Sequence, residues 1–212
     1  MPFPHGKTRH PRGVRQAILF ARPGQFLVMS FDPLQVYQPE ADTFLLLHAA
    51  RDEVRAGDRV LEIGTGSGTV AAGITGPLTL VATDINPHAV SCAAGKGVTV
   101  VRTDLFSGIR GTFDLILFNP PYLPTQPHER IDDWLEYALD GGEDGRAVIR
   151  RFSEGVGRVL SSGGRILLLI SSLTGIDAVK ELFSRQGFIS RVVLEEAAED
   201  ERLYILRITR GR

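Results

Sequence analysis

The stretch Val60-Leu61-Glu62-Ile63-Gly64-Thr65-Gly66-Ser67-Gly68 decides how the rest of the chain is interpreted. The apolar run over residues 59–63 predicts a buried parallel strand. Three glycines at every second position then let the backbone turn tightly and come close to a ligand. A helix predicted over residues 69–74 would begin with free N–H groups that face the same place. An ordinary strand–turn–helix crossover shows the same pattern, so this stretch alone does not establish a binding site.

Two later strand ends carry carboxylates. The apolar run over residues 80–84 ends in Asp84, about 20 residues after the glycines, which is the spacing expected of an acid that binds ribose hydroxyls. A third predicted strand, residues 97–102, is followed by Asp104. Ligands of parallel sheets bind at the carboxyl ends of the strands, so Glu62, Asp84 and Asp104 should share one edge. The alternative is that the two aspartates only solvate strand ends or cap helices.

A fourth predicted strand, residues 113–118, leads directly into the tetrad Asn119-Pro120-Pro121-Tyr122. The glycine loop, the two aspartates and this tetrad, in that order, resemble a class I S-adenosylmethionine-dependent methyltransferase. The tetrad resembles that of enzymes that methylate a planar nitrogen. Residues 36–44 and residues 141–146 further resemble the HemK-type glutamine methyltransferases, especially the short branch found in archaea and eukaryotes.

The resemblance implies that S-adenosylmethionine is the cofactor. Asp84 would accept the ribose hydroxyls through charge-assisted hydrogen bonds, Asp104 would accept from the adenine amine beside Leu105, and Glu62 would lie near the cationic methionine end. The residues expected to bind the cofactor are Thr43, Glu62, Gly64, Gly66, Asp84, Asp104, Leu105 and Asn119. Thr43 or Asp42 also suits a helix cap, and for Thr43 the two roles are compatible.

The tetrad is expected to carry both catalysis and substrate binding. An amide or aromatic amine is a poor nucleophile, because the lone pair on its nitrogen is delocalised. The Asn119 side-chain oxygen and the Pro120 carbonyl can hold both hydrogens of such an NH₂ group and aim its lone pair at the methyl carbon. Pro120 and Pro121 stiffen the loop, and Tyr122 can stack on the planar substrate. The alternative is an ordinary proline turn.

Two functions fit this pattern. The first is methylation of a glutamine side-chain amide, and by resemblance the substrate would be the Gly-Gly-Gln loop of a class 1 peptide-chain release factor. The second is methylation of adenine N6 or guanine N2, because such enzymes share similar tetrads. A duplex base must be flipped out, which generally requires a recognition domain or basic groove. This chain shows neither beyond a short basic arm, so the protein substrate is favoured over nucleic acid.

The resemblance also bears on partners. The short branch often works with a small zinc-binding activator subunit, which makes such a subunit a candidate partner. The longer bacterial enzymes carry an N-terminal helical domain that grips the release factor, and here only about 40 residues precede the cofactor segment. Residues 141–146 are expected either to shape the rim where substrate enters or to form a flexible loop before a helix.

Alternating strands and helices predict an α/β, Rossmann-like fold with a mostly parallel sheet covered by helices on both faces. Two last strands joined by the acidic turn 195–201 predict an antiparallel edge, which completes the seven-stranded pattern of the resembled family. Helices are expected at 44–50, 88–94, 145–160 and 175–186, and the remaining strands at 165–171, 190–194 and 203–208. Residues 32–212 should form this methyltransferase domain and residues 1–31 a basic N-terminal extension.

That extension contains five Lys or Arg residues and no acid. Its first 15 residues are rich in Pro and Gly and are expected to be mobile. Residues 16–21 and 25–30 predict a hairpin about Arg22-Pro23-Gly24. The arm could touch RNA or the ribosome, or it could be a solvated tail.

Composition excludes several other classes. The 212 residues suffice for one sizeable α/β domain, and a net charge of -1 creates no global field that attracts nucleic acid. One cysteine, Cys92, excludes an intramolecular disulfide, and the five histidines show no metal-ligand spacing. No apolar stretch is long enough to span a membrane, and the N-terminus lacks a signal-peptide pattern. A cytoplasmic enzyme without a metal or a membrane partner is therefore expected.

Overall fold

The computed structural model describes residues 15–22, 25–76, 78–128, 133–198 and 200–211, and for residues 15–30 it describes the backbone alone. The strands are β1 (Arg15–Arg22), β2 (Gln25–Phe31), β3 (Arg59–Ile63), β4 (Thr79–Asp84), β5 (Val100–Arg102), β6 (Phe113–Phe118), β7 (Leu160–Ser171), β8 (Phe188–Ala197) and β9 (Arg202–Arg210). The α-helices are α1 (Ala41–Glu53), α2 (Thr69–Gly73), α3 (Pro87–Gly95), α4 (Trp134–Tyr137), α5 (Ala147–Val156) and α6 (Ile176–Arg185). Two short 3₁₀ helices, η1 (Pro33–Gln35) and η2 (Ser172–Thr174), complete the described elements.

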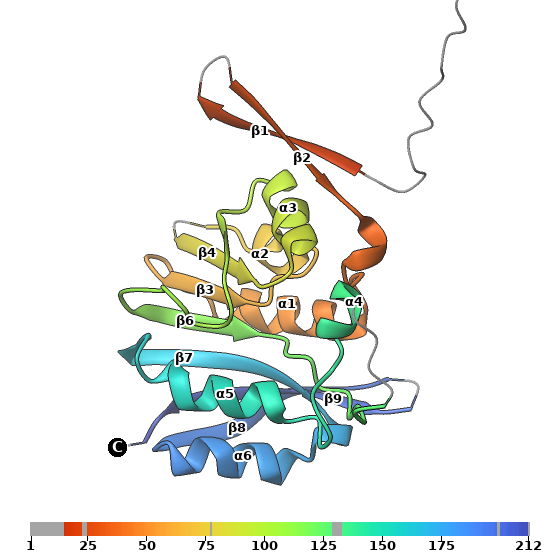
Figure 1. Ribbon diagram of the computed structural model, residues 1–212. Helices are drawn as coiled ribbons and strands as arrows, with labels where there is room; N and C mark the ends of the chain where they lie inside the picture. Colours follow the sequence, from red (N-terminus) through yellow and green to blue (C-terminus); the bar gives the residue numbers. More distant parts are fainter. Residues whose placement is uncertain (1–14, 23–24, 77, 129–132, 199, 212) are drawn as a thin grey trace, which may run out of the picture.

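Seven strands form one sheet in the order β5-β4-β3-β6-β7-β9-β8 (Figure 1). The neighbours from β5 to β7 pair in parallel, whereas β9 pairs antiparallel with both β7 and β8. The predicted seven-stranded, mostly parallel sheet with an antiparallel edge is confirmed. The chain leaves β3 toward β4 and β5, and later returns to the other side of β3 as β6. Ligands bind beyond the carboxyl ends of the strands at such a reversal of order.

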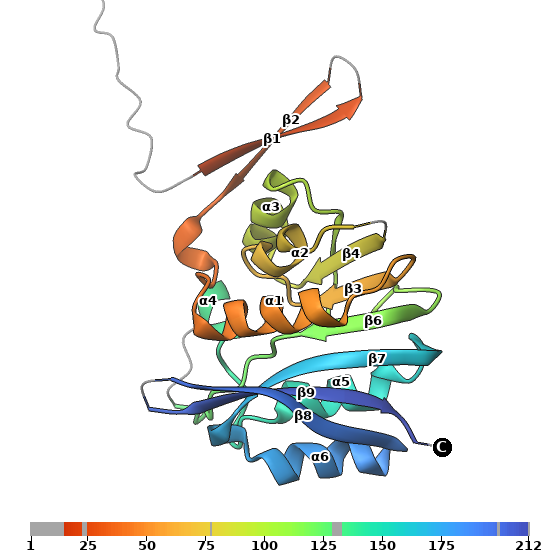
Figure 2. The same ribbon diagram turned by 180° about the vertical axis from the view of Figure 1, so that it is seen from behind.

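The two faces of the sheet carry separate apolar clusters. Side chains of β3, β6 and β7 point alternately to one face and the other, as strand geometry requires. One set, which includes Leu61 and Ile116, packs against α5 and α6, and the other, which includes Val60 and Leu115, packs against α1 and α2. Figure 1 shows α5 and α6 in front of the sheet, and Figure 2 shows α1 in front from the opposite side. Central strands buried on both faces explain their nearly continuous apolar sequences.

Several element ends lie where the sequence predicts them. The strands at residues 59–63 and 113–118 match in full, and Asn86 caps α3 by accepting a hydrogen bond from the His88 N–H. The strand predicted from residue 97 begins only at Val100, because Gly97 has a φ of 81° and still belongs to the turn. The short helix α4 was not predicted from the sequence.

The helix predicted to reach residue 160 is wrong at its end. α5 stops at Val156, and β7 already begins at Leu160. Val156, Val159 and Leu160 are apolar at helical spacing, so the sequence pattern does not show that the helix ends at Val156. The guanidinium of Arg158 donates to the carbonyls of Phe106 and Ile109 at 2.8 Å each, which holds the chain in a turn between the two elements.

The predicted cap of α1 is also wrong. The helix begins two or three residues earlier than a cap at Asp42 or Thr43 requires, and the cap position is Glu40, which makes no side-chain cap. Asp42 and Thr43 are buried in the first turn, where the Asp42 carboxylate is engaged by other donors. The Asp42 carboxylate therefore accepts hydrogen bonds from Tyr37 and Asn119 and does not cap the helix.

The predicted N-terminal hairpin is confirmed: β1 and β2 pair antiparallel and lie beside α3 (Figure 1). The expectation of mobility over the first residues falls on residues 1–14, which lie outside the described part of the chain, as do residues 23–24 of the predicted turn. In the part of the chain that the structure describes, no helix has the length and apolar character needed to cross a membrane.

Candidate active site

The three glycines after β3 form a turn that presents bare backbone. Gly64, Gly66 and Gly68 have positive φ values of 63°, 53° and 77°. A Cβ on Gly68 would lie 2.7 Å from the Cα of Ala93 in α3, so the turn packs directly on that helix. A Cβ on Gly66 would meet nothing within 4 Å, so that side of the turn is open. An open, glycine-lined turn at the reversal of strand order is a suitable cradle for a ligand.

Asp84 lies against this turn at the end of β4. One carboxylate oxygen accepts from the Gly66 N–H at 2.8 Å, and the other accepts from the Asn86 N–H at 2.8 Å. Burial raises the pKa of Asp84, although these two backbone hydrogen bonds oppose the shift. A carboxylate oxygen has more than one lone-pair site. Asp84 therefore keeps acceptor capacity of the kind that a pair of ribose hydroxyls requires.

Glu62 is buried beneath the turn. Its Oε2 accepts from the Thr65 hydroxyl at 2.7 Å. Burial raises the pKa of Glu62 to about 8, and the hydrogen bond from Thr65 only partly opposes this. A cation beside a carboxyl group favours its ionised form. Glu62 is therefore suited to respond to a positively charged ligand group at this position.

Asp104 and Leu105 follow β5. The Asp104 carboxylate forms an ion pair with Arg151 of α5 at 2.6 Å, and both side chains are about half-exposed. Leu105 has a φ of 46° and is the one non-glycine residue of the described chain with positive φ, a conformation that costs roughly 1–2 kcal/mol. The Thr103 N–H donates to the Asp84 carbonyl at 2.9 Å. The end of β5 therefore lies beside Asp84, while the Asp104 carboxylate is bound to Arg151.

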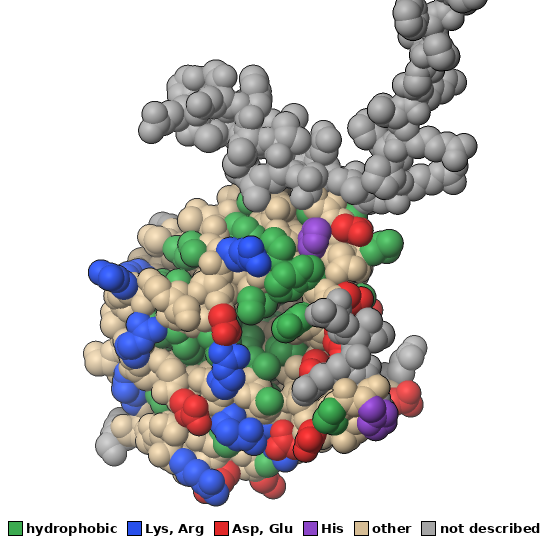
Figure 3. Space-filling model, in the orientation of Figure 1, with side chains coloured by type: hydrophobic (Ala, Val, Ile, Leu, Met, Phe, Trp, Pro, Cys, Tyr) green, Lys and Arg blue, Asp and Glu red, His purple; other side chains and the backbone are tan. Residues whose placement is uncertain are grey.

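A hollow of about 560 Å³ opens between residues 104–110 and α5, and Asp104 and Leu105 line it. Neither Asp84 nor Asn119 does. Figure 3 shows apolar side chains in the middle of this face with charged side chains around them. This hollow is thus not the place where the strand-end polar groups meet, so we take the glycine turn and the tetrad as the centre of the candidate site.

The tetrad begins where β6 ends and lies beside the glycine turn. Phe118 stacks on Phe152 of α5 with ring centroids 4.7 Å apart, and a Cβ on Gly64 would lie 3.9 Å from the Asn119 carbonyl oxygen. The Asn119 Nδ2 donates to Asp42 Oδ2 at 2.9 Å. The Asn119 Oδ1 is closed to solvent, and no donor in the described part of the chain bonds to it. A strong acceptor at this place is thus left without a hydrogen.

The Tyr122 side chain contacts Glu201, a residue near the C-terminus. Its hydroxyl donates to Glu201 Oε1 at 3.3 Å, and the other Glu201 oxygen accepts from Ser171. Burial and the negative charges of Asp42 and Glu201 raise the pKa of Tyr122, so the phenol stays protonated. The hydroxyl end of the Tyr122 ring is therefore held by Glu201.

The segment of residues 141–146 packs against the tetrad. Gly145 has a φ of 69°, and a Cβ there would clash with the Tyr122 carbonyl oxygen. The Leu123 N–H and carbonyl bond the Leu139 carbonyl and the Gly141 N–H at 3.1 and 2.9 Å. The structure thus places this segment beside the tetrad, as a substrate rim requires.

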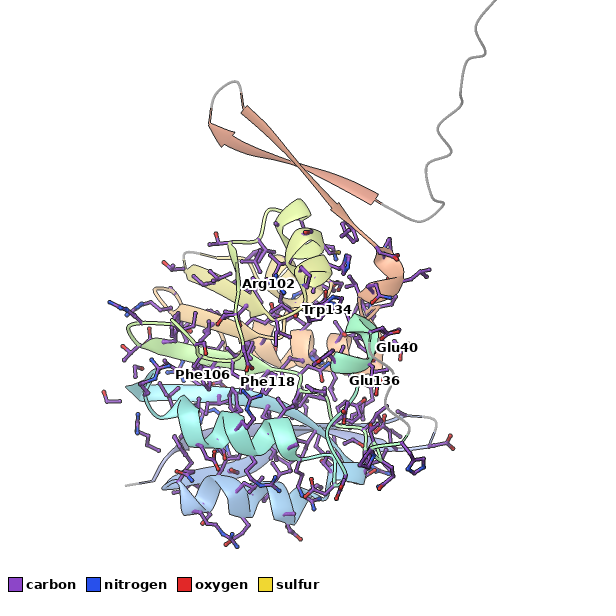
Figure 4. All side chains as sticks on the ribbon, viewed as in Figure 1. Glu40, Arg102, Phe106, Phe118, Trp134 and Glu136 are labelled. Carbon is purple, nitrogen blue, oxygen red and sulfur yellow. The ribbon has the colours of Figure 1, made fainter. Side chains whose placement is uncertain are left out.

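The short helix α4 lies at the same end of the sheet as the tetrad (Figure 1). The Trp134 N–H of α4 donates to Gln35 Oε1 at 3.0 Å, and the Arg102 guanidinium carbon lies 5.7 Å from the centre of the Trp134 ring. Figure 4 shows Trp134 beside Arg102, and Glu40 beside Glu136. α4 therefore connects η1 to the end of β5.

Sequence reasoning missed three side chains around the tetrad: Tyr37, Asp42 and Glu201. Tyr37 donates to Asp42 Oδ2 at 3.0 Å, whereas the sequence indicates only a helix cap for Asp42. Thr43, expected to contact the cofactor, is buried beside Asp42 and donates its N–H to Asp42 Oδ1 at 2.5 Å. No local pattern connects these residues with a tetrad about 80 positions away. Among the residues that the structure describes, no cluster of His, Cys, Asp and Glu could hold a metal ion.

Known proteins match this chain over most of its length. The sequence model of the family described as "Methyltransferase small domain" matches residues 38–133. A Methanocaldococcus jannaschii protein assigned by name to the protein N5-glutamine methyltransferases is 44% identical over 149 residues, which cover 66% of this chain and 75% of that protein. Human methyltransferase HEMK2 is 34% identical over 193 residues, covering 83% of this chain and 90% of HEMK2.

A solved structure agrees. A chain of the E. cuniculi Mtq2–Trm112 complex, described as responsible for methylation of the eRF1 translation termination factor, has a TM-score of 0.71 at 28% identity and covers 84% of this chain and 99% of that one. Fold and site together define a class I S-adenosylmethionine-dependent methyltransferase. The chain belongs to the HemK-type family of protein N5-glutamine methyltransferases.

Proposed function

We propose that this chain transfers a methyl group from S-adenosylmethionine to the side-chain amide nitrogen of a glutamine in the Gly-Gly-Gln loop of a class 1 peptide-chain release factor. The observation that carries the proposal is the Asn119 Oδ1, a buried acceptor to which no described donor bonds. Leaving such a group unpaired costs about 1–3 kcal/mol, and a substrate NH₂ group satisfies it. Relatives named for glutamine methylation, and a related complex described as methylating eRF1, support this substrate.

The proposed cofactor site surrounds the glycine turn. The open backbone at Gly66, the neighbouring Gly64 and the remaining acceptor capacity of Asp84 fit a ribose and an extended tail. Glu62 is proposed to face the methionine end, and Asp104 with Leu105 the adenine end. Thr43, Asn119 and the residues after β6 complete the set. S-adenosylmethionine supplies an electrophilic methyl group on a sulfonium.

In the proposed mechanism the protein acts by position and by charge. The Asn119 Oδ1 and the Pro120 carbonyl accept the two amide hydrogens, which holds the nitrogen lone pair toward the methyl carbon. Positioning of this kind contributes about 7–11 kcal/mol. The N–C bond forms as the S–C bond breaks, and the same two oxygens stabilise the positive charge on nitrogen. One N–H proton then leaves to water, and Tyr122 supports the planar amide by stacking.

We also propose a partner subunit and a cellular location for this enzyme. The Mtq2 relative was solved with Trm112, which supports a small activator subunit for this chain as well, and we propose that it binds zinc. Translation termination takes place in the cytoplasm, where the enzyme would then act. Activity measured with and without the co-expressed partner, before and after chelation, tests both points: loss on chelation of the complex but not of the isolated chain is expected.

Methyl transfer to cell extract tests the substrate class. Radiolabelled S-adenosylmethionine and the protein are added to extract, which is then treated separately with protease and nuclease. The proposal predicts that protease removes the label from the macromolecular fraction and nuclease does not. Label that resists protease and disappears with nuclease would contradict it. The Asn119→Ala variant, which lacks the proposed acceptor, is the matched control and should label the extract about 10²–10³-fold more slowly.

A further inference from the structure

We infer that Asp42 is a positioning residue for catalysis, whose carboxylate fixes the Asn119 side chain with its oxygen, and not its NH₂ group, left for the substrate. The inference rests on the proposed function, because it concerns the same amide-binding site. It adds a residue from α1 that touches neither of the reacting atoms in the proposed mechanism and acts through Asn119.

The orientation of an asparagine amide must be imposed by its partners. The two ends of the group have similar shapes, and rotation by a half-turn exchanges an acceptor for a donor. In the exchanged orientation Asn119 would offer N–H groups to a substrate NH₂, which cannot accept them productively. Catalysis by two carbonyl oxygens therefore requires a group that rejects this orientation.

Asp42 is such a group. An ionised carboxylate only accepts hydrogen bonds, and Asp42 Oδ2 lies 2.9 Å from Asn119 Nδ2. The half-turn would bring the Asn119 oxygen against the carboxylate oxygen and replace an attraction by a repulsion. The donor end of Asn119 is thus held by Asp42, and the acceptor end remains unpaired among the described residues.

The carboxylate is itself held in place. Asp42 is 4% exposed, and the Tyr37 hydroxyl donates to Oδ2 at 3.0 Å. Oδ1 accepts from the Thr43 N–H at 2.5 Å and from the Thr43 hydroxyl at 3.2 Å. Burial and the adjacent Asp42 charge raise the pKa of Tyr37, so the phenol remains a donor. With both oxygens bonded to other groups, Asp42 cannot easily rotate away from Asn119.

A local structural role does not explain this arrangement. An acidic residue in the first turn of α1 is favourable beside the helix dipole, but that interaction needs no contact with a residue 77 positions away. The inference predicts a specific dependence on Asn119, which neither a helix-dipole role nor a direct electrostatic effect on the substrate shares.

The test is a double-mutant cycle in methyl transfer to a release factor, with the partner subunit present. Asp42→Asn keeps the shape but can donate to either end of Asn119, so kcat should fall about 10–100-fold, with the cofactor Kd within a few-fold of wild type. In the Asn119→Ala background, Asp42→Asn should have no further effect on kcat. The control Asp52→Asn removes an exposed carboxylate of the same helix, paired at 3.5 Å with His48, and should change nothing.

An equal loss of kcat in both backgrounds would overturn the inference, because Asp42 would then act without Asn119. A second readout does not depend on activity. The Asn119 side-chain NH₂ signals in a ¹⁵N NMR spectrum, assigned by their absence in Asn119→Ala, should shift in Asp42→Asn and not in Asp52→Asn. Unshifted signals would also overturn the inference. A wild-type protein that methylates no release factor would instead contradict the proposed function, and the NMR result would still decide the orientation.

Discussion

Two groups of buried polar side chains lie at opposite ends of the central strands, and their hydrogen bonds differ. At the amino ends, Arg165 is 2% exposed and donates to Asp58 at 2.6 Å and to Glu53 at 3.0 Å. Arg207 adds a bond to Glu53 at 2.9 Å. Each of these charges is thus paired with an opposite one.

The carboxyl ends are less completely paired. Among the charged and polar groups described there, Glu62 has a hydroxyl as its side-chain partner, Asp84 has backbone N–H groups, and the Asn119 oxygen has no bonded donor. Buried polar groups without full pairing cost free energy, and in native proteins they mark places where a ligand or a reaction supplies the missing partner. We therefore assign the first group to stability and the second to function.

The pKa values of the two groups shift in opposite directions. Burial by itself raises the pKa of Glu53, Asp58 and Glu62. Hydrogen bonds from Arg207 and Arg165 outweigh burial for Glu53, and those from Arg165 do so for Asp58, so both pKa values lie below their ordinary range. At Glu62 burial dominates and the pKa is about 8.

The largest expected effect is on stability, from Arg165→Met. Removing the arginine leaves the buried Asp58 carboxylate without its arginine partner, which typically costs about 3–5 kcal/mol, whereas the half-buried Glu53 keeps its bond to Arg207. Denaturant unfolding measures the loss, and the control is Arg185→Met, which removes an exposed arginine that pairs with Glu181. Cofactor affinity of the folded Arg165→Met protein should stay at the wild-type value. A stable variant with weakened cofactor binding would reverse our assignment of the two ends.

The next effect is on rate, from Asn119→Ala. Loss of one preorganised group that stabilises charge in the transition state typically lowers kcat by about 10²–10³-fold. Stability should fall only modestly: the acceptor that is removed has no bonded donor in the described structure, and Asp42, which loses the Asn119 Nδ2 donor, keeps Tyr37 and Thr43 as donors. Turnover within a few-fold of wild type at saturating cofactor would show that this oxygen is not used.

A smaller loss is expected for cofactor affinity, from Asp84→Ala. The variant removes the acceptor that we propose for the ribose hydroxyls, at an expected cost of about 1–3 kcal/mol. Calorimetric titration with S-adenosylmethionine and its demethylated product measures this cost. Because Asp84 also accepts from Gly66 and Asn86, the variant Asp84→Asn, which keeps one oxygen, serves as a second test. Wild-type affinity in both folded variants would remove Asp84 from the site.

The effect that is smallest per unit of pH is on the pH dependence of stability, from Glu62. Its pKa is raised from 4.5 to about 8 in the folded state, so between these values unfolding releases a proton. The stability from this group is full below 4.5, falls as pH rises, and is lost above about 8. The free energy of unfolding of wild type should therefore fall relative to Glu62→Gln by at most about 1.4 kcal/mol per pH unit. Parallel pH profiles would contradict this.

The geometry of the proposed cofactor half could be predicted from the sequence because its signals are local. The strand Arg59–Ile63, the glycine turn and the carboxylate of Asp84 each belong to a short segment with its own pattern, and the parallel sheet brings such strand ends together. The interaction of Asp104 with Arg151 could not be foreseen, because it joins residues 47 positions apart on a solvent-facing loop and helix.

The supports of the tetrad could not be predicted for the same reason. Asp42 and Glu201 meet Asn119 and Tyr122 across 77 and 79 positions, and no periodicity connects such residues. The tetrad itself was apparent from its prolines and from the apolar strand before it. Its orientation depends on tertiary contacts, which local propensity and spacing do not encode.

Peptide mass spectrometry of a purified class 1 release factor tests the central claim most directly. After incubation with the protein, its partner subunit and S-adenosylmethionine, the peptide with the Gly-Gly-Gln loop should gain the mass of one methylene group, located on the glutamine. A factor with Gln→Ala at that position should gain nothing. An unmodified factor, together with methylation of an RNA or DNA oligomer under the same conditions, would contradict the account.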